Sequence, residues 1–223
     1  MNFLREYLKS KKENPIGEYS LGNSTVYIKE PLVPEIDLQN ILKFVSENLP
    51  IDFYSNVEMI YIGNFPFLIA RQVDALFENG AIYLSSKIKT EQHLLADLIH
   101  EIAHAFEEAN PEEVYSDGAV EQEFLSKRNK MLEIFRANGY TCNTADFLNT
   151  EYDKSFDEML YSTLGYEKVG NMTSGLFISP YAATSLREYF ANAFEEFFVR
   201  DMKTVQKSTP AVYKKIVERL DFF

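Results

Sequence analysis

The pentapeptide His100-Glu101-Ile102-Ala103-His104 constrains this chain more than any other sequence feature. Residues four positions apart share one face of an α-helix, so two imidazoles at this spacing can bind one ion. Zinc accepts imidazole nitrogen, and in catalytic sites it keeps one position open for water. Glu101 follows the first histidine and can take a proton from that water. The pattern predicts a helix that carries a zinc site with a general base.

Local signals predict where this helix begins and which elements surround it. Thr90 can cap it, with Glu91 in the first turn, and Asn110-Pro111 ends it. Strands are predicted from β-branched and aromatic runs at residues 24–29, 57–62 and 81–85. Other helices are predicted at residues 35–48, about 119–138, 156–165 with a Ser155 and Glu158 capping box, 185–200, and from Thr209-Pro210 onward.

This order of elements predicts an α+β fold, because the strands precede residue 86 and helices dominate afterwards. The length of 223 residues suits one domain, residues 1–223. Within it we expect a sheet lobe over residues 1–109, which includes the helix of the histidine pair, and a helical lobe over residues 110–223.

Charge and cysteine content narrow the classes of protein. A net charge of -12 argues against nucleic-acid binding, since such a chain repels phosphates. Cys142 is the one cysteine, which excludes a disulfide framework and a cysteine-based zinc site. Charges interrupt residues 1–10, so no signal peptide is predicted, and no segment is long enough for a transmembrane helix. We expect a soluble protein that is cytoplasmic, exported by a non-classical route, or secreted with a leader removed.

A third protein ligand is required, and the helix itself does not supply it. His93 lies seven residues before His100, which is about 10 Å along a helix and too far to share the ion. Positions 107 and 110 are Glu and Asn, so the arrangement with a glycine turn and a downstream histidine is absent. No histidine remains elsewhere in the chain, and a carboxylate is therefore expected.

The segment over residues 185–198 is the best donor of that carboxylate. Glu188, Asn192 and Glu195 line one face of its predicted helix. We favour Glu188 as the ligand, with Asn192 one turn further on, where its amide would hydrogen-bond a ligand imidazole. The alternatives are that Glu188 forms a capping box with Ser185, or that Glu195 is the ligand rather than a surface charge.

Taken together, these residues resemble the zincin metallopeptidases related to anthrax lethal factor. The resemblance rests on residues 100–104, on Tyr181 and on residues 188–195, which read Glu-Tyr-Phe-Ala-Asn-Ala-Phe-Glu. The catalytic domain of lethal factor and the small bacterial Pro-Pro endopeptidases share a Glu-aromatic-aromatic-Ala-x-x-Phe helix. A tyrosine precedes its ligand glutamate by seven residues, as Tyr181 precedes Glu188 here. The likeness covers about residues 80–220 with an insertion.

The resemblance implies a zincin-like fold with the active-site helix between the two lobes. It implies one Zn²⁺ per chain, bound by His100, His104 and Glu188 as in gluzincins, with Glu101 as the catalytic base. Tyr181 would donate to the oxyanion of the reaction, although it can equally be a buried aromatic side chain after Pro180. The strand at residues 81–85 would be the sheet edge that binds an extended peptide substrate, or else an ordinary core strand.

The chain departs from these relatives in two places. Asn192 stands where they usually have an acidic residue. About forty residues, roughly 141–180, are inserted before Tyr181. The insertion carries apolar side chains that we expect to pack as a cover over the cleft: Tyr152, Phe156, Leu160, Tyr161, Tyr166 and Phe177.

Three functions are compatible with these features. The leading hypothesis is a zinc metalloendopeptidase acting on extended peptides. The second is a binding or regulatory protein with little or no activity on the same scaffold, which the insertion motivates. The third is a histidine pair in a structural core that binds no metal.

Overall fold

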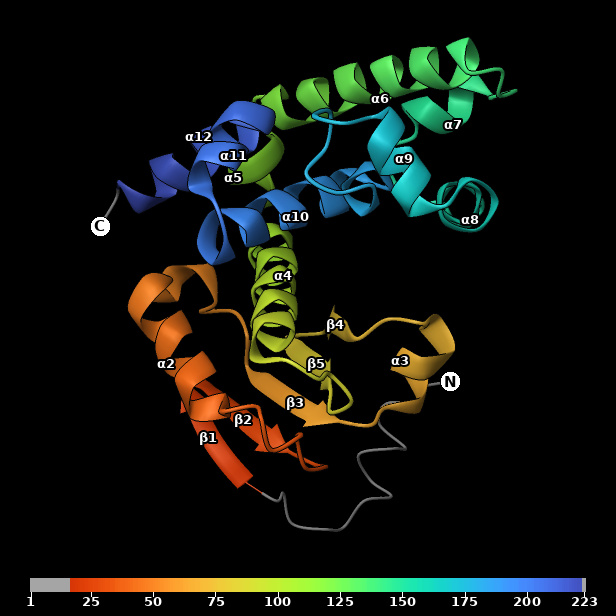
Figure 1. Ribbon diagram of the computed structural model, residues 1–223. Coiled ribbons are helices and arrows are strands. Elements are labelled where there is room, and N and C mark those ends of the chain that lie inside the picture. Colours follow the sequence, from red (N-terminus) through yellow and green to blue (C-terminus); the bar gives the residue numbers. More distant parts are fainter. Residues whose placement is uncertain (1–16, 222–223) are drawn as a thin grey trace. The chain divides into compact units, whose positions relative to one another are not determined.

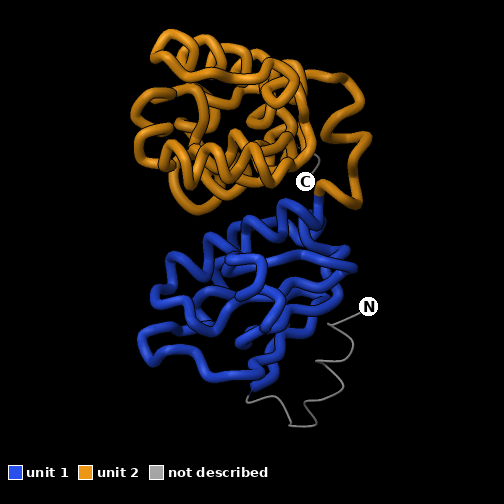
Figure 2. Tube along the Cα trace, turned by 90° about the vertical axis from the view of Figure 1, so that its right-hand side faces the viewer, with its two compact units in different colours: residues 1–106 blue, residues 107–223 orange. Residues whose placement is uncertain are grey.

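The computed structural model describes residues 17–221, which belong to two units, residues 1–106 and residues 107–223 (Figure 2). The boundary falls inside the helix that carries the histidine pair, slightly before the expected lobe boundary at residue 109. Residues 1–10, on which the expectation of no signal peptide rests, lie outside the described range. Among the described residues, no helix has the length and apolar character needed to cross a membrane.

Unit 1 is built on a five-stranded sheet with the order β1-β2-β3-β5-β4 (Figure 1). Neighbours β2, β3 and β5 are parallel, whereas β1 and β4 pair antiparallel with β2 and β5. The strands are β1 (Gly17–Leu21), β2 (Ser24–Ile28), β3 (Met59–Gly63), β4 (Ala75–Glu78) and β5 (Ala81–Ser85). The three predicted strands are confirmed, while β1 and β4 were not predicted, since both lack the β-branched residues that typify strands.

The position of β5 corrects one expectation from the resemblance. Residues 81–85 do not form the edge of the sheet, because β5 lies between β3 and β4 and all five of its residues are buried. The edge belongs instead to β4, whose Phe77 pairs with Ile82 of β5. The alternative of an ordinary core strand is therefore right for residues 81–85.

Helices cover both faces of this sheet. From residue 17 onward, the helices of this unit are α2 (Leu38–Asn48), η1 (Ile51–Phe53), α3 (Pro66–Arg71) and α4 (Glu91–Ala109, which continues into unit 2). On one face, Phe65 and Leu68 at α3 form a buried cluster with Ala81 and Tyr83 of β5. The alternating residues Ile82 and Leu84 point to the opposite face. There the buried side chains of α2 and α4 complete the core: Ile41, Leu42, Val45, Leu94, Leu98 and Ile102.

Capping residues explain where the two long helices of unit 1 begin. The Thr90 hydroxyl accepts a hydrogen bond from the His93 backbone N–H at 3.2 Å, which confirms the predicted start of α4. Helix α2 begins at Leu38 rather than at residue 35, because Asp37 caps it by accepting from the Asn40 N–H at 3.2 Å.

Unit 2 consists of helices joined by short connections. They are α5 (Pro111–Tyr115), α6 (Ala119–Ala137), α7 (Thr144–Leu148), α8 (Lys154–Glu158), η2 (Met159–Leu164), α9 (Tyr166–Met172), η3 (Tyr181–Ala183), α10 (Leu186–Val199), α11 (Met202–Ser208) and α12 (Pro210–Leu220). The predicted helices at 119–138, 185–200 and from Pro210 are confirmed. Most of the short helices were not predicted, because segments of five to seven residues have too few periodic positions and depend on packing.

One predicted cap in unit 2 is wrong, and a second is right in position but lacks the side-chain hydrogen bond of a cap. Asp153, rather than Ser155, caps α8 by accepting from the Phe156 N–H at 2.9 Å. The following turns widen into the π-helical η2 and end at Gly165, whose φ of 83° suits glycine. Thr209 is the N-cap residue of α12, and Pro210 follows in the first turn as predicted. The Thr209 hydroxyl, however, donates to the Val205 carbonyl at 3.1 Å.

The insertion at residues 141–180 folds into α7, α8, η2 and α9, and much of it belongs to the core of unit 2. Phe156, Leu160 and Phe177 are buried, whereas Tyr152 and Tyr161 are 51% and 62% exposed. Part of the apolar set therefore stabilises unit 2 itself. Its expected action as a cover stays a prediction.

One buried arginine holds the insertion in place. Arg128 of α6 is 1% exposed and donates to the carbonyls of Ala183, Asp146 and Asn149. Its guanidinium also lies 3.9 Å from the centre of the Phe156 ring. Burial lowers the pKa of this guanidinium to about 10, so it remains charged at neutral pH. Arg128 thus joins the insertion to the turn that carries Tyr181.

We predict that Arg128→Met lowers the free energy of unfolding by about 3 kcal/mol or more, because buried carbonyls lose a charged donor. Denaturant unfolding would measure the change. Arg136→Met is a matched control on the same helix, since exposed Arg136 also contacts the insertion, through Thr144 at 2.7 Å. The control should change stability by about 0.5 kcal/mol or less. Equal effects of the two variants would contradict the role given to Arg128.

Candidate metal centre

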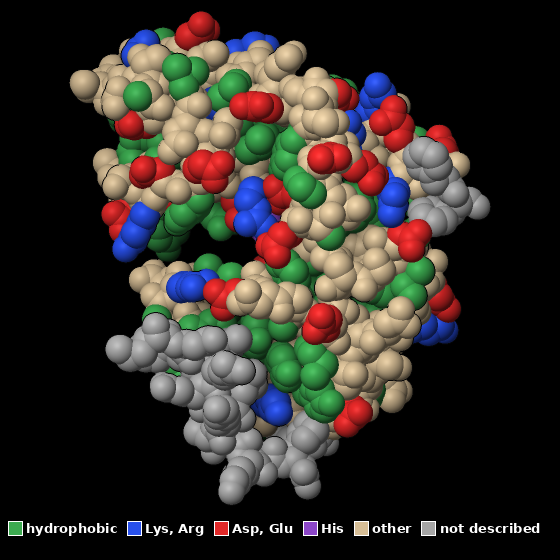
Figure 3. All heavy atoms as spheres, turned by 180° about the vertical axis from the view of Figure 1, so that it is seen from behind, with side chains coloured by type: hydrophobic (Ala, Val, Ile, Leu, Met, Phe, Trp, Pro, Cys, Tyr) green, Lys and Arg blue, Asp and Glu red, His purple; other side chains and the backbone are tan. Residues whose placement is uncertain are grey.

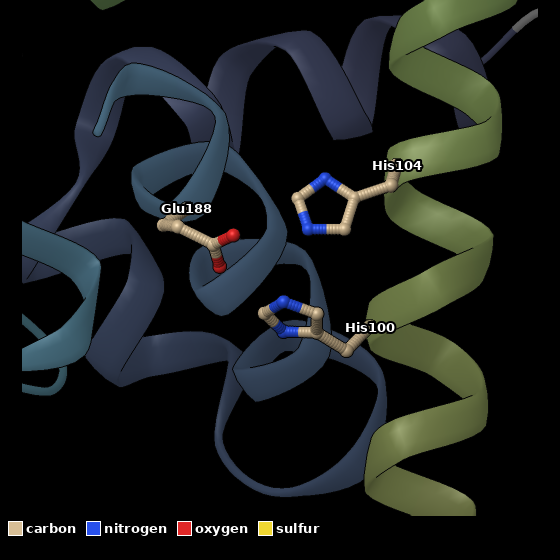
Figure 4. A group of neighbouring side chains, drawn as sticks. All are labelled: His100, His104 and Glu188. Carbon is tan, nitrogen blue, oxygen red and sulfur yellow. The ribbon is translucent and has the colours of Figure 1, made fainter. Parts of the chain in front are cut away.

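The two histidines of the pentapeptide lie on one face of α4, as their spacing predicts. The centres of the His100 and His104 rings are 4.8 Å apart, and the ring planes are nearly perpendicular at 80°. Figure 4 shows both imidazoles projecting from the same side of the helix. Both side chains are half-buried, and the Nδ1 atom of His104 is itself buried. This pair can supply two imidazole donors to a single ion.

The opposite side of α4 fixes the direction of these imidazoles. Ile99, Ile102 and Ala103 are fully buried. The backbone carbonyl of Ala105, on the same helix, accepts a hydrogen bond from the Asn56 side-chain amide at 2.6 Å. A helix that is packed along one side cannot rotate without exposing apolar surface. The packing of α4 therefore helps to orient the histidine pair.

Glu101 is held by the edge strand of the sheet. Its side chain is buried, with 7% exposure, and its Oε2 accepts a hydrogen bond from the Phe77 backbone N–H at 2.6 Å. Because this N–H faces Glu101, it points away from β5, the neighbouring strand. The bond constrains a carboxylate that stands beside His100 in sequence. Sequence reasoning could not find it, since a backbone donor 24 positions away leaves no signal in residue type.

Glu188 lies in the first turn of α10, in unit 2, and Figure 4 includes its carboxylate. Ser185 caps this helix by accepting from the Glu188 backbone N–H at 3.1 Å. This is the serine half of the capping box that sequence analysis weighed. The side chain is half-buried, so its carboxylate remains accessible to a ligand.

The side chain of Asn192 forms hydrogen bonds inside unit 2. Its Nδ2 donates to the Glu188 carbonyl at 2.9 Å, and its Oδ1 accepts from the Ser179 hydroxyl at 2.7 Å. The same hydroxyl accepts from the Ala182 N–H at 3.1 Å. Asn192 therefore joins the first turns of α10 to the η3 turn, which Tyr181 begins. The expected hydrogen bond from Asn192 to an imidazole stays a prediction.

Tyr181 opens η3, which packs against α10. Its carbonyl accepts from the Thr184 hydroxyl at 2.8 Å, and its half-buried ring lies 6.4 Å from the ring of Tyr166. Tyr166 in turn donates to Asp157, and burial together with this carboxylate raises the pKa of its phenol. The insertion thus supplies an anchored aromatic neighbour to Tyr181.

The alternative ligand Glu195 has a different environment on the same helix. Its carboxylate lies 3.6 Å from the Arg200 guanidinium, near the end of α10. Glu195 belongs to none of the groups among the described residues whose donor atoms are close enough to share a metal ion. His93 belongs to a different group from His100 and His104, in agreement with the distance argument.

On one face of the molecule, acidic side chains are spread over the surface rather than gathered into one patch (Figure 3). On the face drawn in Figure 3, Asp and Glu are interspersed with Lys and Arg on both units. This distribution agrees with the acidic composition and gives no basic surface on that face for a phosphate backbone.

Comparisons with known proteins found no family model, no curated protein and no solved structure that matches this chain.

We predict that Asn192→Ala lowers the free energy of unfolding by about 1–3 kcal/mol, since it leaves buried polar partners without their bonds. Combining it with Ser179→Ala tests the link to the Tyr181 turn, because the double variant should lose less than the sum of the two single losses. Denaturant unfolding of all three variants measures this coupling. Strictly additive losses would show that Asn192 and Ser179 act independently.

Proposed function

We propose that this protein is a zinc-dependent metalloendopeptidase of the zincin type, in which His100, His104 and Glu188 bind the ion. The observation that carries the proposal is the histidine pair on one face of α4, with Glu101 held beside it by the edge strand. Glu188, in the first turn of α10 in unit 2, would complete the set of protein ligands.

The chemistry of these donors fits zinc. Two imidazole nitrogens and one carboxylate oxygen make up the protein ligands of many catalytic zinc sites, which leave a further position open. Softer metals prefer thiolates, and calcium and magnesium prefer oxygen ligands. All three side chains are half-buried, which suits a site that substrate must reach.

A contact inside unit 2 supports Glu188 over Glu195. Glu107 lies near the end of α4, and its buried carboxylate accepts from the Arg187 Nε at 3.2 Å. Arg187 precedes Glu188, so this ion pair holds the first turn of α10 inside unit 2. Glu195 lies two turns further along α10 and pairs with Arg200.

Glu101 would act as the general base and then as the proton donor. A zinc ion held by these ligands would polarise the scissile carbonyl and make a water molecule more acidic. The Glu101 carboxylate accepts the proton of that water and passes it to the leaving amine. The hydrogen bond from the Phe77 N–H to Oε2 already fixes the position of this carboxylate. Little further conformational entropy of Glu101 would therefore be lost in the transition state.

Tyr181 would stabilise the negative charge that develops on the carbonyl oxygen. A phenol is a good hydrogen-bond donor to an oxyanion when its position is fixed beforehand. The hydrogen bonds of Ser179 and Thr184 fix the η3 turn, and the ring of Tyr166 lies beside that of Tyr181. The insertion therefore supports the catalytic tyrosine in this proposal.

The substrate would be a peptide in extended form, added to the edge strand β4. Backbone groups of an antiparallel strand alternate in direction, and the Phe77 N–H points away from β5. The groups of Ala75 and the Phe77 carbonyl share that outward direction and can pair with a peptide. Pairing of this kind recognises the backbone of the substrate rather than its side chains, so it suits an endopeptidase.

A second candidate is a binding or regulatory protein with little activity on the same scaffold. Exposed apolar side chains on the insertion favour it, namely Leu148, Tyr152 and Tyr161, which are 50%, 51% and 62% exposed. Incubation of the zinc-loaded protein with a diverse peptide library separates the two functions. Cleavage supports the peptidase, whereas retained zinc without any cleavage supports the binding protein.

We predict that Glu101→Gln lowers kcat by roughly 10²-fold or more, because the amide cannot accept the proton. Zinc content should be unchanged, since Glu101 is not a ligand in this proposal. Peptide-library cleavage and elemental analysis measure the two quantities. Undiminished cleavage by this variant would rule out the mechanism.

We predict that Glu188→Gln weakens zinc binding by at least about 100-fold. Loss of a direct ligand should cost more affinity than loss of a residue that only hydrogen-bonds a ligand. Glu195→Gln is the matched control on the same helix and should leave the affinity unchanged. Competition with a zinc chelator measures both variants. The opposite ranking would identify Glu195 as the ligand.

We predict that Phe77→Pro lowers kcat about tenfold with a smaller effect on KM, because the variant lacks the N–H that positions Glu101. Proline is tolerated on an edge strand where the N–H faces outward. Phe77→Ala is the control, since it removes the same side chain but keeps the N–H. A similar loss in both variants would assign the effect to the phenyl ring instead.

A further inference from the structure

The third histidine of the chain lies in a separate cluster of metal-binding side chains within unit 1. His93 and Asp97 are one turn apart on α4, and Asp74 immediately precedes the edge strand β4. One donor atom from each residue lies within 4.8 Å of the others. We propose that His93, Asp97 and Asp74 form a second zinc site, distinct from the one that includes His100 and His104.

The spacing of the donor atoms is the first argument for this site. The His93 Nε2 lies 3.5 Å from Asp97 Oδ2 and 3.8 Å from Asp74 Oδ2. A direct hydrogen bond between nitrogen and oxygen would bring them to about 2.9 Å. Two ligands of a tetrahedral zinc ion, each bonded at about 2.0–2.1 Å, are roughly 3.3 Å apart. The observed separations are therefore closer to those of ligands around one ion.

The types of donor are the second argument. One imidazole and two carboxylates give a nitrogen and two oxygens, a set that zinc accepts, with water completing the coordination. Calcium and magnesium favour oxygen ligands alone, so the imidazole selects against them. A divalent cation would balance the negative charge that two carboxylate ligands bring to such a site.

The origin of the ligands gives the site a structural role. Two come from α4, and the third precedes β4, whose Phe77 N–H holds Glu101. The Asp74 carbonyl also accepts from the Ser85 N–H at 2.8 Å, at the end of β5. An ion bound here would join the first turns of α4 to the start of the edge strand. Any ligand that binds only the folded state stabilises it, so zinc should raise the melting temperature through this site.

The competing explanation is an ordinary surface ion pair. The side chains of His93 and Asp74 are about half exposed, at 51% and 55%, and that of Asp97 is 21% exposed. A protonated imidazole between two such carboxylates contributes little to stability. The two explanations differ in whether the cluster binds zinc, which can be measured directly.

The chain has three histidines, so the variant His100→Ala/His104→Ala leaves His93 as the sole imidazole. Zinc chloride is titrated into this full-length variant while the imidazole resonances are followed by NMR. We expect saturable shifts of the His93 signals at one zinc per chain. Adding Asp97→Asn or Asp74→Asn should weaken this binding at least tenfold, while Glu108→Gln, an exposed carboxylate at the other end of α4, should not. Absence of saturable shifts would show an ion pair only.

A second measurement covers the case in which the double histidine variant does not fold. The zinc content of the otherwise unmodified chain is compared with that of Asp97→Asn and of Asp74→Asn after equilibration with zinc. We expect both substitutions to remove one zinc per chain, and unchanged zinc content would overturn the proposal. If the unmodified chain binds one zinc and both variants bind none, the second site stands and the proposed catalytic site fails.

Discussion

The packing of one side of α4 against the sheet is the constraint on which the candidate site depends. Ile99, Ile102 and Ala103 are buried on that side, so the helix has one permitted orientation about its axis. This packing orients His100 and His104, the two residues that are expected to bind the ion. The apolar residues themselves are not expected to be ligands. A cavity beneath the helix would cost a few kcal/mol and also release the histidine pair. Stability and site geometry are therefore coupled in unit 1.

The edge strand β4 is the second element that organises unit 1. It contributes a backbone donor to Glu101 through Phe77, and Asp74 at its start lies near His93. An edge strand normally exposes unpaired backbone groups, which invite association with other chains. Here one such group is used by the carboxylate expected to act as base. The remaining outward groups are those with which the proposed peptide substrate would pair.

Unit 2 adds buried polar side chains to its apolar packing. Arg128 holds the insertion by donating to backbone carbonyls, and Asn192 holds the turn of Tyr181 through Ser179. Such networks are specific because each donor must meet its acceptor at a fixed distance. The insertion is thereby part of the support of Tyr181, which goes beyond the cover that its apolar residues suggest.

The sequence by itself determined the elements whose signals are local. The Thr90 cap, the spacing of His100 and His104, and the Ser185 cap before Glu188 all act within a few residues, and the structure contains each of them. The strands at β2, β3 and β5 were readable for the same reason, since their β-branched and aromatic runs are continuous in sequence.

Only the tertiary structure decided which distant groups meet. The order of the sheet made β4 the edge instead of β5, and that order depends on pairing between strands far apart in the chain. The Phe77 N–H that reaches Glu101 is present in every residue type but proline, so no sequence pattern marks it. The partners of Arg128 are likewise backbone carbonyls, and Asp74 comes near His93 because a strand and a helix pack together. Residue types fix what each group can do, whereas the fold fixes which groups are close enough to do it together.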